Sequence, residues 1–220
     1  MIDEFKTREK IVHLIARIIH FKAIEAAIPL YHQNSTINLN QKKMKTFEVP
    51  TREEVTPANQ EIFDNLKKSL GFVPNLYATM AYSTNGLARF LAYSNAKTSL
   101  NNKEKEAVNL IVSQINDCVY CQSAHTLIGK MNGFTDEQLL DFRRGKSDNP
   151  KLNALVQLAA DITQNRGRAS EELINAFYEQ GYTNENLIDV ILLVSDKTAM
   201  NYIHNLTQVP VDFPVAPALA

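Results

Sequence analysis

The stretch GFTDEQLLDF (133–142) decides the fold, because it recurs as GYTNENLIDV (181–190) with a residue of the same kind at each position. In each copy, a glycine of the type that ends helices precedes a threonine, Thr135 or Thr183, of the type that caps the next helix. The third residue after the threonine can complete a capping box. Gln138 suits this role in the first copy, and Asn186 is a poorer equivalent in the second. Both copies therefore predict a helix, a tight turn and another helix.

The recurrence has two interpretations. It indicates either two related helical units or turns that share the same chemistry by chance. When the first half is projected onto the second without gaps, the two cysteines and the histidine near them fall on Arg166, Ala169 and Leu173. Chemistry that depends on those side chains is therefore confined to the first half, and the second half would be structural.

Helical periodicity extends over the chain beyond Met44. No proline lies between Pro74 and Pro150 or between Pro150 and Pro210, so the residue that most often interrupts helices is missing from both intervals. No alternating run bounded by turn residues indicates a strand. The sequence predicts a compact all-α domain over 44–220. Residues recur there at helical spacing in three groups: Ala107, Leu110, Ile111 and Ile115; Leu155, Leu158, Ala159 and Ile162; Ile188, Ile191, Leu192 and Ser195.

The composition narrows the classes of function. The 220 residues are 45% hydrophobic, which is enough for a substantial core. The net charge of −1 implies no broad basic surface, so nucleic acid is not expected as a partner. The two cysteines are close in sequence and do not suggest the disulfide framework of a secreted protein. These features fit a cytoplasmic protein.

Residues 1–43 are expected to form a separate segment. Apolar residues within 11–28 recur at helical spacing opposite a polar stripe, which predicts an amphipathic helix that Pro29 helps to end. Charged residues interrupt this run, so it predicts neither a membrane span nor a secretory signal. The polar, aperiodic stretch 31–43 is interpreted as a linker. The whole segment is either an arm that packs on a partner subunit or a dispensable extension.

The stretch NDCVYCQSAH (116–125) contains both cysteines and one of the five histidines. We expect Asp117 to be the N-cap of a helix that runs to about Gly129, with Cys118 in its first turn. Unpaired N–H groups and the positive end of the helix macrodipole stabilise a thiolate there. Cys121 follows at i+3, a spacing that permits a small-loop disulfide. The stretch therefore predicts a dithiol–disulfide couple.

His125 lies on the same helical stripe as both cysteines, where it can accept or return a proton. Other interpretations stay open. Attachment of haem requires a histidine directly after the second cysteine, where this chain has Gln122. A structural zinc ion needs a fourth ligand, which only another subunit could supply. The thiols can also be buried and inert. The chain has no glycine-rich nucleotide motif, so no cofactor is predicted. No metal is predicted either.

The spacing Glu106-x11-Cys118-x2-Cys121-x3-His125 resembles the signature of the alkylhydroperoxidase D and carboxymuconolactone decarboxylase-like superfamily, specifically its peroxidase-related branch. The resemblance covers most of residues 48–213. The helical lead-in before the motif, the turn after it and the closing helices are also similar to the family pattern. The four spaced side chains are the specific part of this match.

The resemblance implies an all-α fold in which two adjacent helices bring Glu106 to the cysteines. It implies that the Cys121 thiolate attacks the peroxide O–O bond and becomes a sulfenic acid, which Cys118 resolves as a disulfide. Glu106 and His125 would carry protons. An external dithiol or redox protein would then reduce the disulfide. The implied protein is a homo-oligomeric, thiol-dependent peroxidase with a hydroperoxide substrate.

Several residues leave questions open. Cys118 is nearer the helix start and would by helix electrostatics have the lower pKa, so the order of the two thiol roles is not fixed. Only the spacing selects Glu106 over Glu104; taken alone, it reads as a solvated carboxylate at a helix start. Tyr120 stands where the best-described hydroperoxidases have a histidine, and it is interpreted as packing. His204 is likewise interpreted as a packing residue.

Two other functions stay open. One is a decarboxylase or lactone-handling enzyme of the same fold, although such relatives act without a cysteine pair. The other is a non-catalytic helical assembly protein whose thiols are incidental.

Overall fold

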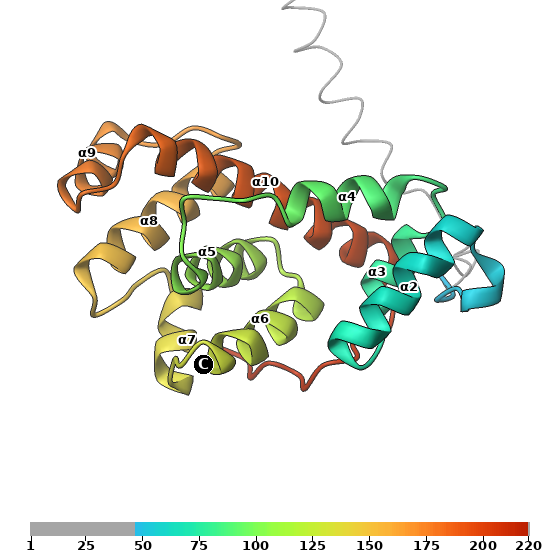
Figure 1. The fold of residues 1–220 in the computed structure, drawn as a ribbon. Coiled ribbons are helices and arrows are strands. Elements are labelled where there is room, and N and C mark those ends of the chain that lie inside the picture. The colour runs from blue at the N-terminus through green and yellow to red at the C-terminus, as the bar shows by residue number, and fades with distance from the viewer. Residues whose placement is uncertain (1–46, 220) are drawn as a thin grey trace, which may run out of the picture. The chain divides into compact units, whose positions relative to one another are not determined.

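A computed structural model describes residues 47–219 of the chain. This part contains one short 3₁₀ helix and nine α-helices and no strand (Figure 1), which confirms the predicted all-α fold. The predicted helix in 11–28 and the predicted linker at 31–43 lie outside the described residues. The elements are η1 (Arg52–Glu54), α2 (Pro57–Leu70), α3 (Asn75–Met80), α4 (Gly86–Ser94), α5 (Asn102–Ile115), α6 (Val119–Met131), α7 (Asp136–Arg143), α8 (Pro150–Gln164), α9 (Glu171–Glu179) and α10 (Asn184–Thr207).

Helix α5 lies at the centre of the fold. It packs against α6, α7, α8 and α10, and Figure 1 shows it between α10 above and α6 and α7 below. Its apolar positions are buried, as their helical spacing predicts, and they meet the equally buried apolar face of α8. Burial on all sides makes α5 a rigid support for any polar side chain that it carries.

The two recurring turns have the same geometry. Gly133 and Gly181 both have left-handed backbone, with φ of 84° and 81°, and so end α6 and α9. Thr135 and Thr183 then cap α7 and α10, and both capping boxes are complete. The second box was expected to be the weaker one; Asn186 nevertheless accepts the Thr183 backbone N–H at 2.8 Å.

The correspondence between the halves extends beyond these turns. Asn101 caps α5 and Asn149 caps α8, at the same sequence offset that separates the two threonine caps. In space, α6 packs on α5 as α9 packs on α8. These features favour two related helical units over chance similarity. The last helices differ, because α7 has 8 residues and α10 has 24.

Helix α10 buries several polar residues together with Val190, Val194 and Met200, and it leaves other apolar residues exposed. Ile188, Ile191 and Leu192 recur at helical spacing as the sequence predicts, but their exposed fractions are 56%, 38% and 45%. Their spacing thus identified the helix, although these residues lie outside the core. Tyr202 and Leu206 continue this exposed apolar face, which we call the α10 outer stripe. The inner face instead buries Asp196, Lys197, Asn201 and His204.

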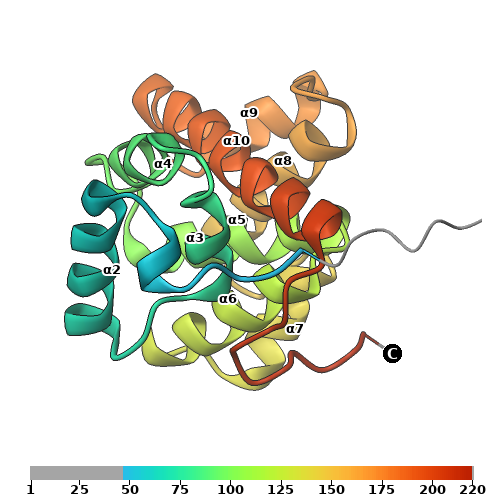
Figure 2. The same cartoon turned by 90° about the vertical axis from the view of Figure 1, so that its right-hand side faces the viewer.

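A second core cluster surrounds the start of α6. Residues of α3 and α4 pack there with Met200 of α10. After α10 the chain runs back across α6 toward α7 (Figure 2), where Ala216 donates its backbone N–H to Ser123 Oγ at 3.0 Å. Arg143 of α7 fixes the end of this tail by donating to the Pro217 carbonyl oxygen at 2.6 Å. Within 47–219, none of the helices is both long and apolar enough to cross a bilayer.

Candidate active site

Helix α6 begins later than its sequence predicts. Cys118 itself is the N-cap, and the helix runs over Val119–Met131, past Gly129. Asp117, the predicted N-cap, has left-handed backbone with φ of 50°, which the short polar side chain of aspartate tolerates. This turn directs the Cys118 backbone N–H to the Ser113 carbonyl oxygen of α5 at 2.9 Å. The Cys118 sulfur therefore lies over the free N–H groups of the helix start.

The two thiols lie side by side. The Cys121 backbone N–H donates to Cys118 Sγ across 3.4 Å, and both cysteines are unpaired and buried. A hydrogen bond from the Cys121 thiol, opposed by burial and assisted by His204, lowers the pKa of Cys118 to about 5. The same hydrogen bond, together with burial, raises the pKa of Cys121. The pair therefore holds a thiolate on Cys118 and a proton on Cys121.

Glu106 of α5 and His125 of α6 form a second pair. His125 Nδ1 and Glu106 Oε2 are 2.7 Å apart, and the two side chains are only 12% and 9% exposed. Because a carboxylate accepts, Nδ1 carries the proton and Nε2 keeps a free lone pair. Interpreting Glu106 as a solvated helix-start carboxylate is therefore wrong. Glu104 serves the helix start instead, in a capping box with Asn101.

Charge and burial set the ionisation of this pair. Burial raises the pKa of Glu106, but His125 and Lys197 outweigh it, so the pKa lies below its usual value. Burial and the Lys197 ammonium lower the pKa of His125, against the opposing effect of Glu106. The arrangement therefore favours an ionised Glu106 and a neutral imidazole at neutral pH.

Three polar residues of α10 complete the site. Lys197, Asn201 and His204 follow one another at i, i+4 and i+7, and all three are buried. The Lys197 charge acts on Glu106, His125 and Cys121 and so links the two pairs. The other two residues act on the thiols. The Asn201 amide lowers the pKa of Cys121, and the His204 imidazole lowers the pKa of Cys118.

The sequence reasoning missed Lys197 and Asn201 and assigned His204 to packing. A signal was present, since polar residues recur at helical spacing within an otherwise apolar helix. Its meaning was hidden because hydrophobic periodicity assigns the apolar face to the core, whereas the buried face of α10 carries polar residues as well.

Tyr120 packs within the second core cluster. Its ring centroid lies 5.2 Å from that of His204 and 5.4 Å from that of Phe213. Its hydroxyl accepts the Leu76 backbone N–H at 3.3 Å. Burial, with a contribution from Asp212, raises the pKa of Tyr120, so the phenol stays neutral. These contacts agree with the packing interpretation.

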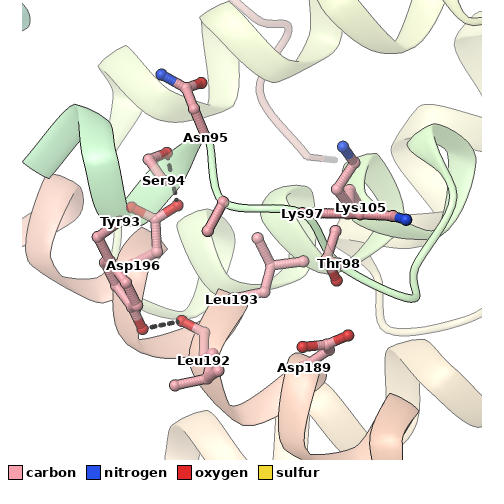
Figure 3. A pocket seen from close by; sticks show the side chains of 11 residues that line it. Tyr93, Ser94, Asn95, Lys97, Thr98, Lys105, Asp189, Leu192, Leu193 and Asp196 are labelled. Carbon is pink, nitrogen blue, oxygen red and sulfur yellow. Dashed lines mark hydrogen bonds between the residues drawn. The ribbon is translucent and has the colours of Figure 1, made fainter.

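A pocket of about 220 Å³ lies between the α4–α5 connection and α10 (Figure 3). Ser94 Oγ donates to Asp196 Oδ2 at 3.0 Å, and the Tyr93 hydroxyl donates to the Leu192 carbonyl oxygen at 2.7 Å. The pocket is lined by Tyr93, Ser94, Asn95, Ala96, Lys97, Thr98, Lys105, Asp189, Leu192, Leu193 and Asp196. Lys105 and Asp196 directly precede Glu106 and Lys197, so the pocket and the site share two helices.

The structure thus brings the four predicted site residues into two pairs, Cys118 with Cys121 and Glu106 with His125. Among the contacts of the described residues, the polar partner of His125 is Glu106 rather than a thiol. Over 47–219, no group of three or more cysteine, histidine, aspartate or glutamate side chains is arranged to hold a metal ion.

Parts of the chain are similar to known proteins. The model of the carboxymuconolactone decarboxylase family matches residues 83–147. The uncharacterized protein YdfG of Bacillus subtilis (strain 168) is 25% identical over 111 residues, which are 49% of this chain and 75% of that protein.

Two solved structures share the fold. One is the alkylhydroperoxidase AhpD core of an uncharacterized peroxidase-related protein from Ralstonia eutropha JMP134, with a TM-score of 0.69, 21% identity and coverage of 76% of this chain and 92% of that chain. The other is a variant of the debrominase Bmp8 in complex with 2,3,4-tribromopyrrole, with a TM-score of 0.64, 17% identity and coverage of 76% and 91%.

These observations define first a class, the all-helical proteins with the alkylhydroperoxidase D core fold. The segment matched by the family model contains all four predicted site residues. The part of the chain around the motif is thus similar to the carboxymuconolactone decarboxylase family, and the whole described domain has the alkylhydroperoxidase D core fold.

Proposed function

We propose that this chain is a thiol-dependent peroxidase that reduces hydroperoxides through a Cys118/Cys121 dithiol–disulfide couple. The observation that carries the proposal is the thiol pair itself, in which the Cys121 backbone N–H donates to Cys118 Sγ across 3.4 Å and the pKa of Cys118 is lowered. A thiolate is the form that attacks a peroxide, and a second thiol within reach allows a disulfide to follow. The likeness to a peroxidase-related protein of the same fold supports the proposal.

Oxidation begins when a hydroperoxide reaches Cys121. A proton moves from Cys121 to Cys118, and the Lys197 ammonium stabilises the negative charge that Cys121 then holds. The Cys121 thiolate attacks the outer peroxide oxygen, the O–O bond breaks, and Cys121 becomes a sulfenic acid. The departing alkoxide takes a proton through the Glu106–His125 pair, which solvent replenishes.

Resolution follows within the same helical turn. Cys118 attacks the sulfenic sulfur of Cys121, the S–S bond forms, and the hydroxyl group leaves as water with the proton of Cys118. An external dithiol or redox protein reduces the disulfide by thiol–disulfide exchange. Such a cycle suits a reducing, cytoplasmic compartment.

We also propose that the chain is a homo-oligomer. The α10 outer stripe supports this, because Ile188, Ile191, Leu192, Tyr202 and Leu206 are exposed along one side of a single helix. Contiguous apolar surface of this kind is typical of an interface between proteins.

Hydroperoxide consumption by the full chain, with dithiothreitol as reductant, tests the proposed activity. Cys118→Ser and Cys121→Ser are each expected to lower turnover by at least about a hundredfold, because each removes one half of the couple. Lys197→Met is expected to lower it by about tenfold or more, through loss of thiolate stabilisation. The matched control is Lys130→Met, which removes an exposed lysine on α6 and should leave turnover unchanged.

Circular dichroism establishes that each variant keeps its helical content. Full turnover with both cysteines replaced would refute the proposal.

Debromination is a second candidate, favoured by the apolar and aromatic residues packed around the thiols, including Tyr77, Phe90 and Phe213. A dithiol can supply the same two electrons to an aryl bromide, giving the debrominated ring, bromide and a disulfide. Bmp8, which shares the fold, is a debrominase. Replacing the hydroperoxide with 2,3,4-tribromopyrrole in the same assay distinguishes the two activities.

A further inference from the structure

The end of α10 fixes one particular tautomer of a buried histidine. Gln208 has left-handed backbone, with φ of 52°, and donates its N–H to the His204 carbonyl oxygen at 2.7 Å. This turn folds the chain back, so that the Val209 carbonyl oxygen lies 3.2 Å from His204 Nε2. A carbonyl oxygen can only accept, so Nε2 carries the proton and Nδ1 of the neutral ring holds a lone pair.

The lone pair on Nδ1 makes no hydrogen bond that would stabilise the described part of the fold. His204 is only 3% exposed, and Nδ1 has no hydrogen-bond partner among the described residues. A buried acceptor without a partner is unfavourable, so this atom calls for an explanation. The imidazole is close enough to Cys118 to lower the pKa of that thiol, which it does as the imidazolium formed when Nδ1 holds the proton.

We propose that His204 is the proton acceptor for Cys118, with Nδ1 taking the thiol proton when Cys118 acts as a nucleophile. This inference rests on the proposed dithiol couple and assigns it a second proton-handling group. Glu106 and His125 then serve Cys121 and the departing alkoxide, whereas His204 serves Cys118.

The surroundings of His204 leave Cys118 without another base. The stabilising partners of the Cys118 thiolate are the thiol and amide of Cys121 and the His204 ring. On the tail, Asp212 accepts the Asn75 backbone N–H through Oδ2 at 2.7 Å and acts on the Tyr120 hydroxyl, not on Cys118. Tyr120 on α6 has a raised pKa and stays neutral. On α10 itself, the Lys197 charge acts on Cys121 and on the Glu106–His125 pair.

The chemistry balances in the resolving step. His204 Nδ1 takes the proton of Cys118 as its sulfur attacks the sulfenic sulfur of Cys121. The S–S bond forms, the S–O bond breaks, and the hydroxide leaves with the proton returned by the imidazolium, giving water. In the reductive direction, the imidazolium protonates the Cys118 thiolate released from the mixed disulfide.

Alkylation of Cys118 by iodoacetamide as a function of pH tests this role without any peroxide. The full chain carries Cys121→Ser, so that Cys118 is the one reactive thiol. Adding His204→Gln is expected to raise the midpoint of the pH profile and to slow alkylation at pH 7 by about tenfold or more, since an ordinary thiol is only a few per cent thiolate at that pH. Adding His125→Gln instead should leave the profile in place.

An unchanged profile in His204→Gln, or a shift produced by His125→Gln alone, would overturn the proposal. If the chain consumed no peroxide, the proposed function would fail while the alkylation result still decided the role of His204. Long-range ¹H–¹⁵N correlation spectra of the reduced wild-type chain keep the test decisive even if His204→Gln does not fold. They are expected to show the Nε2–H tautomer at His204, and an Nδ1–H tautomer would contradict the proposal.

A single-turnover experiment separates the two proton-handling groups. After one equivalent of hydroperoxide, His204→Gln should accumulate a sulfenic acid at Cys121, trapped with dimedone, and form the disulfide about tenfold more slowly or worse. His125→Gln should instead slow formation of the sulfenic acid. Equal effects of both variants on both steps would show that the two histidines act as one group.

Discussion

Cys118 and Cys121 differ in ionisation although they have the same side chain and lie in the same helical turn. Cys118 accepts hydrogen bonds from both the amide and the thiol of Cys121, and accepting stabilises its negative charge. Cys121 donates its proton into that bond and therefore keeps it. The resting thiolate and the attacking thiol are consequently different residues in the proposed cycle, and proton transfer within the pair connects them.

The order of the two roles is tested by trapping the first oxidation product. In Cys118→Ser, one equivalent of hydroperoxide should leave a sulfenic acid on Cys121, because no thiol remains to resolve it. Cys121→Ser should give no sulfenic acid. Dimedone labelling followed by mass spectrometry of the peptide measures this, and a label on Cys118 in Cys121→Ser would reverse the order.

The ionised state of Glu106 should contribute to stability in a pH-dependent way. Its folded-state pKa lies below the usual 4.5, so the contribution is complete above pH 4.5 and is lost as pH falls through the folded-state pKa. Glu106→Gln should lower the free energy of unfolding by about 1–3 kcal/mol at neutral pH, and the difference from wild type should shrink below pH 4.5.

Urea denaturation over a series of pH values measures this difference. Glu137→Gln, which changes an exposed glutamate of α7, serves as the control and should show little effect at any pH. A difference for Glu106→Gln that grew as the pH fell would contradict the assignment.

The predictability of the site differed from residue to residue. Cys118, Cys121 and His125 stand in one short stretch, where helical geometry relates them directly. Glu106 was found only through the family spacing, because a carboxylate early in a helix is ordinary. Lys197 is distant in sequence and reaches the site through tertiary packing, which no local pattern reports.

Among the elements, α6 has an unusual start, because a cysteine occupies its N-cap. A thiolate there satisfies helix N–H groups that serine or aspartate would normally serve. The sequence contains a better N-cap in Asp117, which explains why the predicted helix began too early. The structure uses Asp117 for the left-handed turn from α5 instead.

The N-cap role of Cys118 predicts different stabilities for two small substitutions. Cys118→Ser keeps a side chain that accepts hydrogen bonds at the cap, whereas Cys118→Ala removes it. The alanine variant should therefore be less stable than the serine variant by about 1 kcal/mol. Thermal unfolding of both variants at pH 7 measures the difference, and equal melting temperatures would show that Cys118 caps nothing.

Helices α5, α8 and α10 show what hydrophobic periodicity can and cannot predict. The pattern identified all three as helices, and for α5 and α8 it also identified the buried face. For α10 the residues that share the spacing of Ile188 are exposed, and the buried face carries both apolar and polar residues. Periodicity reports which residues share a face, and only tertiary structure decides what covers that face.

For the whole molecule, the two helical halves carry different parts of the candidate site. The first unit carries the cysteines and the Glu106–His125 pair. The second unit supplies α10, which is far longer than its counterpart α7 and crosses back to the first unit with Lys197, Asn201 and His204. The second half is thus not purely structural, contrary to the expectation from its lack of cysteines.

The α10 outer stripe should hold copies of the chain together. Leu206→Glu, and separately Tyr202→Glu, should reduce the assembly to a species of the single-chain mass of 24.8 kDa, because a buried charge at an apolar interface is unfavourable. Val215→Glu alters a residue of the tail that is equally exposed and should not change the mass. Light scattering coupled to size-exclusion chromatography measures the masses, and a wild-type chain that is already monomeric would contradict the proposed assembly.

Thiol titration before and after one equivalent of hydroperoxide tests the proposed couple most directly, together with mass spectrometry of the peptide that contains Cys118 and Cys121. We predict that both thiols are lost together and that the peptide becomes lighter by about two daltons, the mass of the two hydrogens removed when a disulfide forms. Adding dithiothreitol should restore both. Two thiols that persist after peroxide treatment, or a peptide that only gains oxygen, would contradict the dithiol–disulfide mechanism.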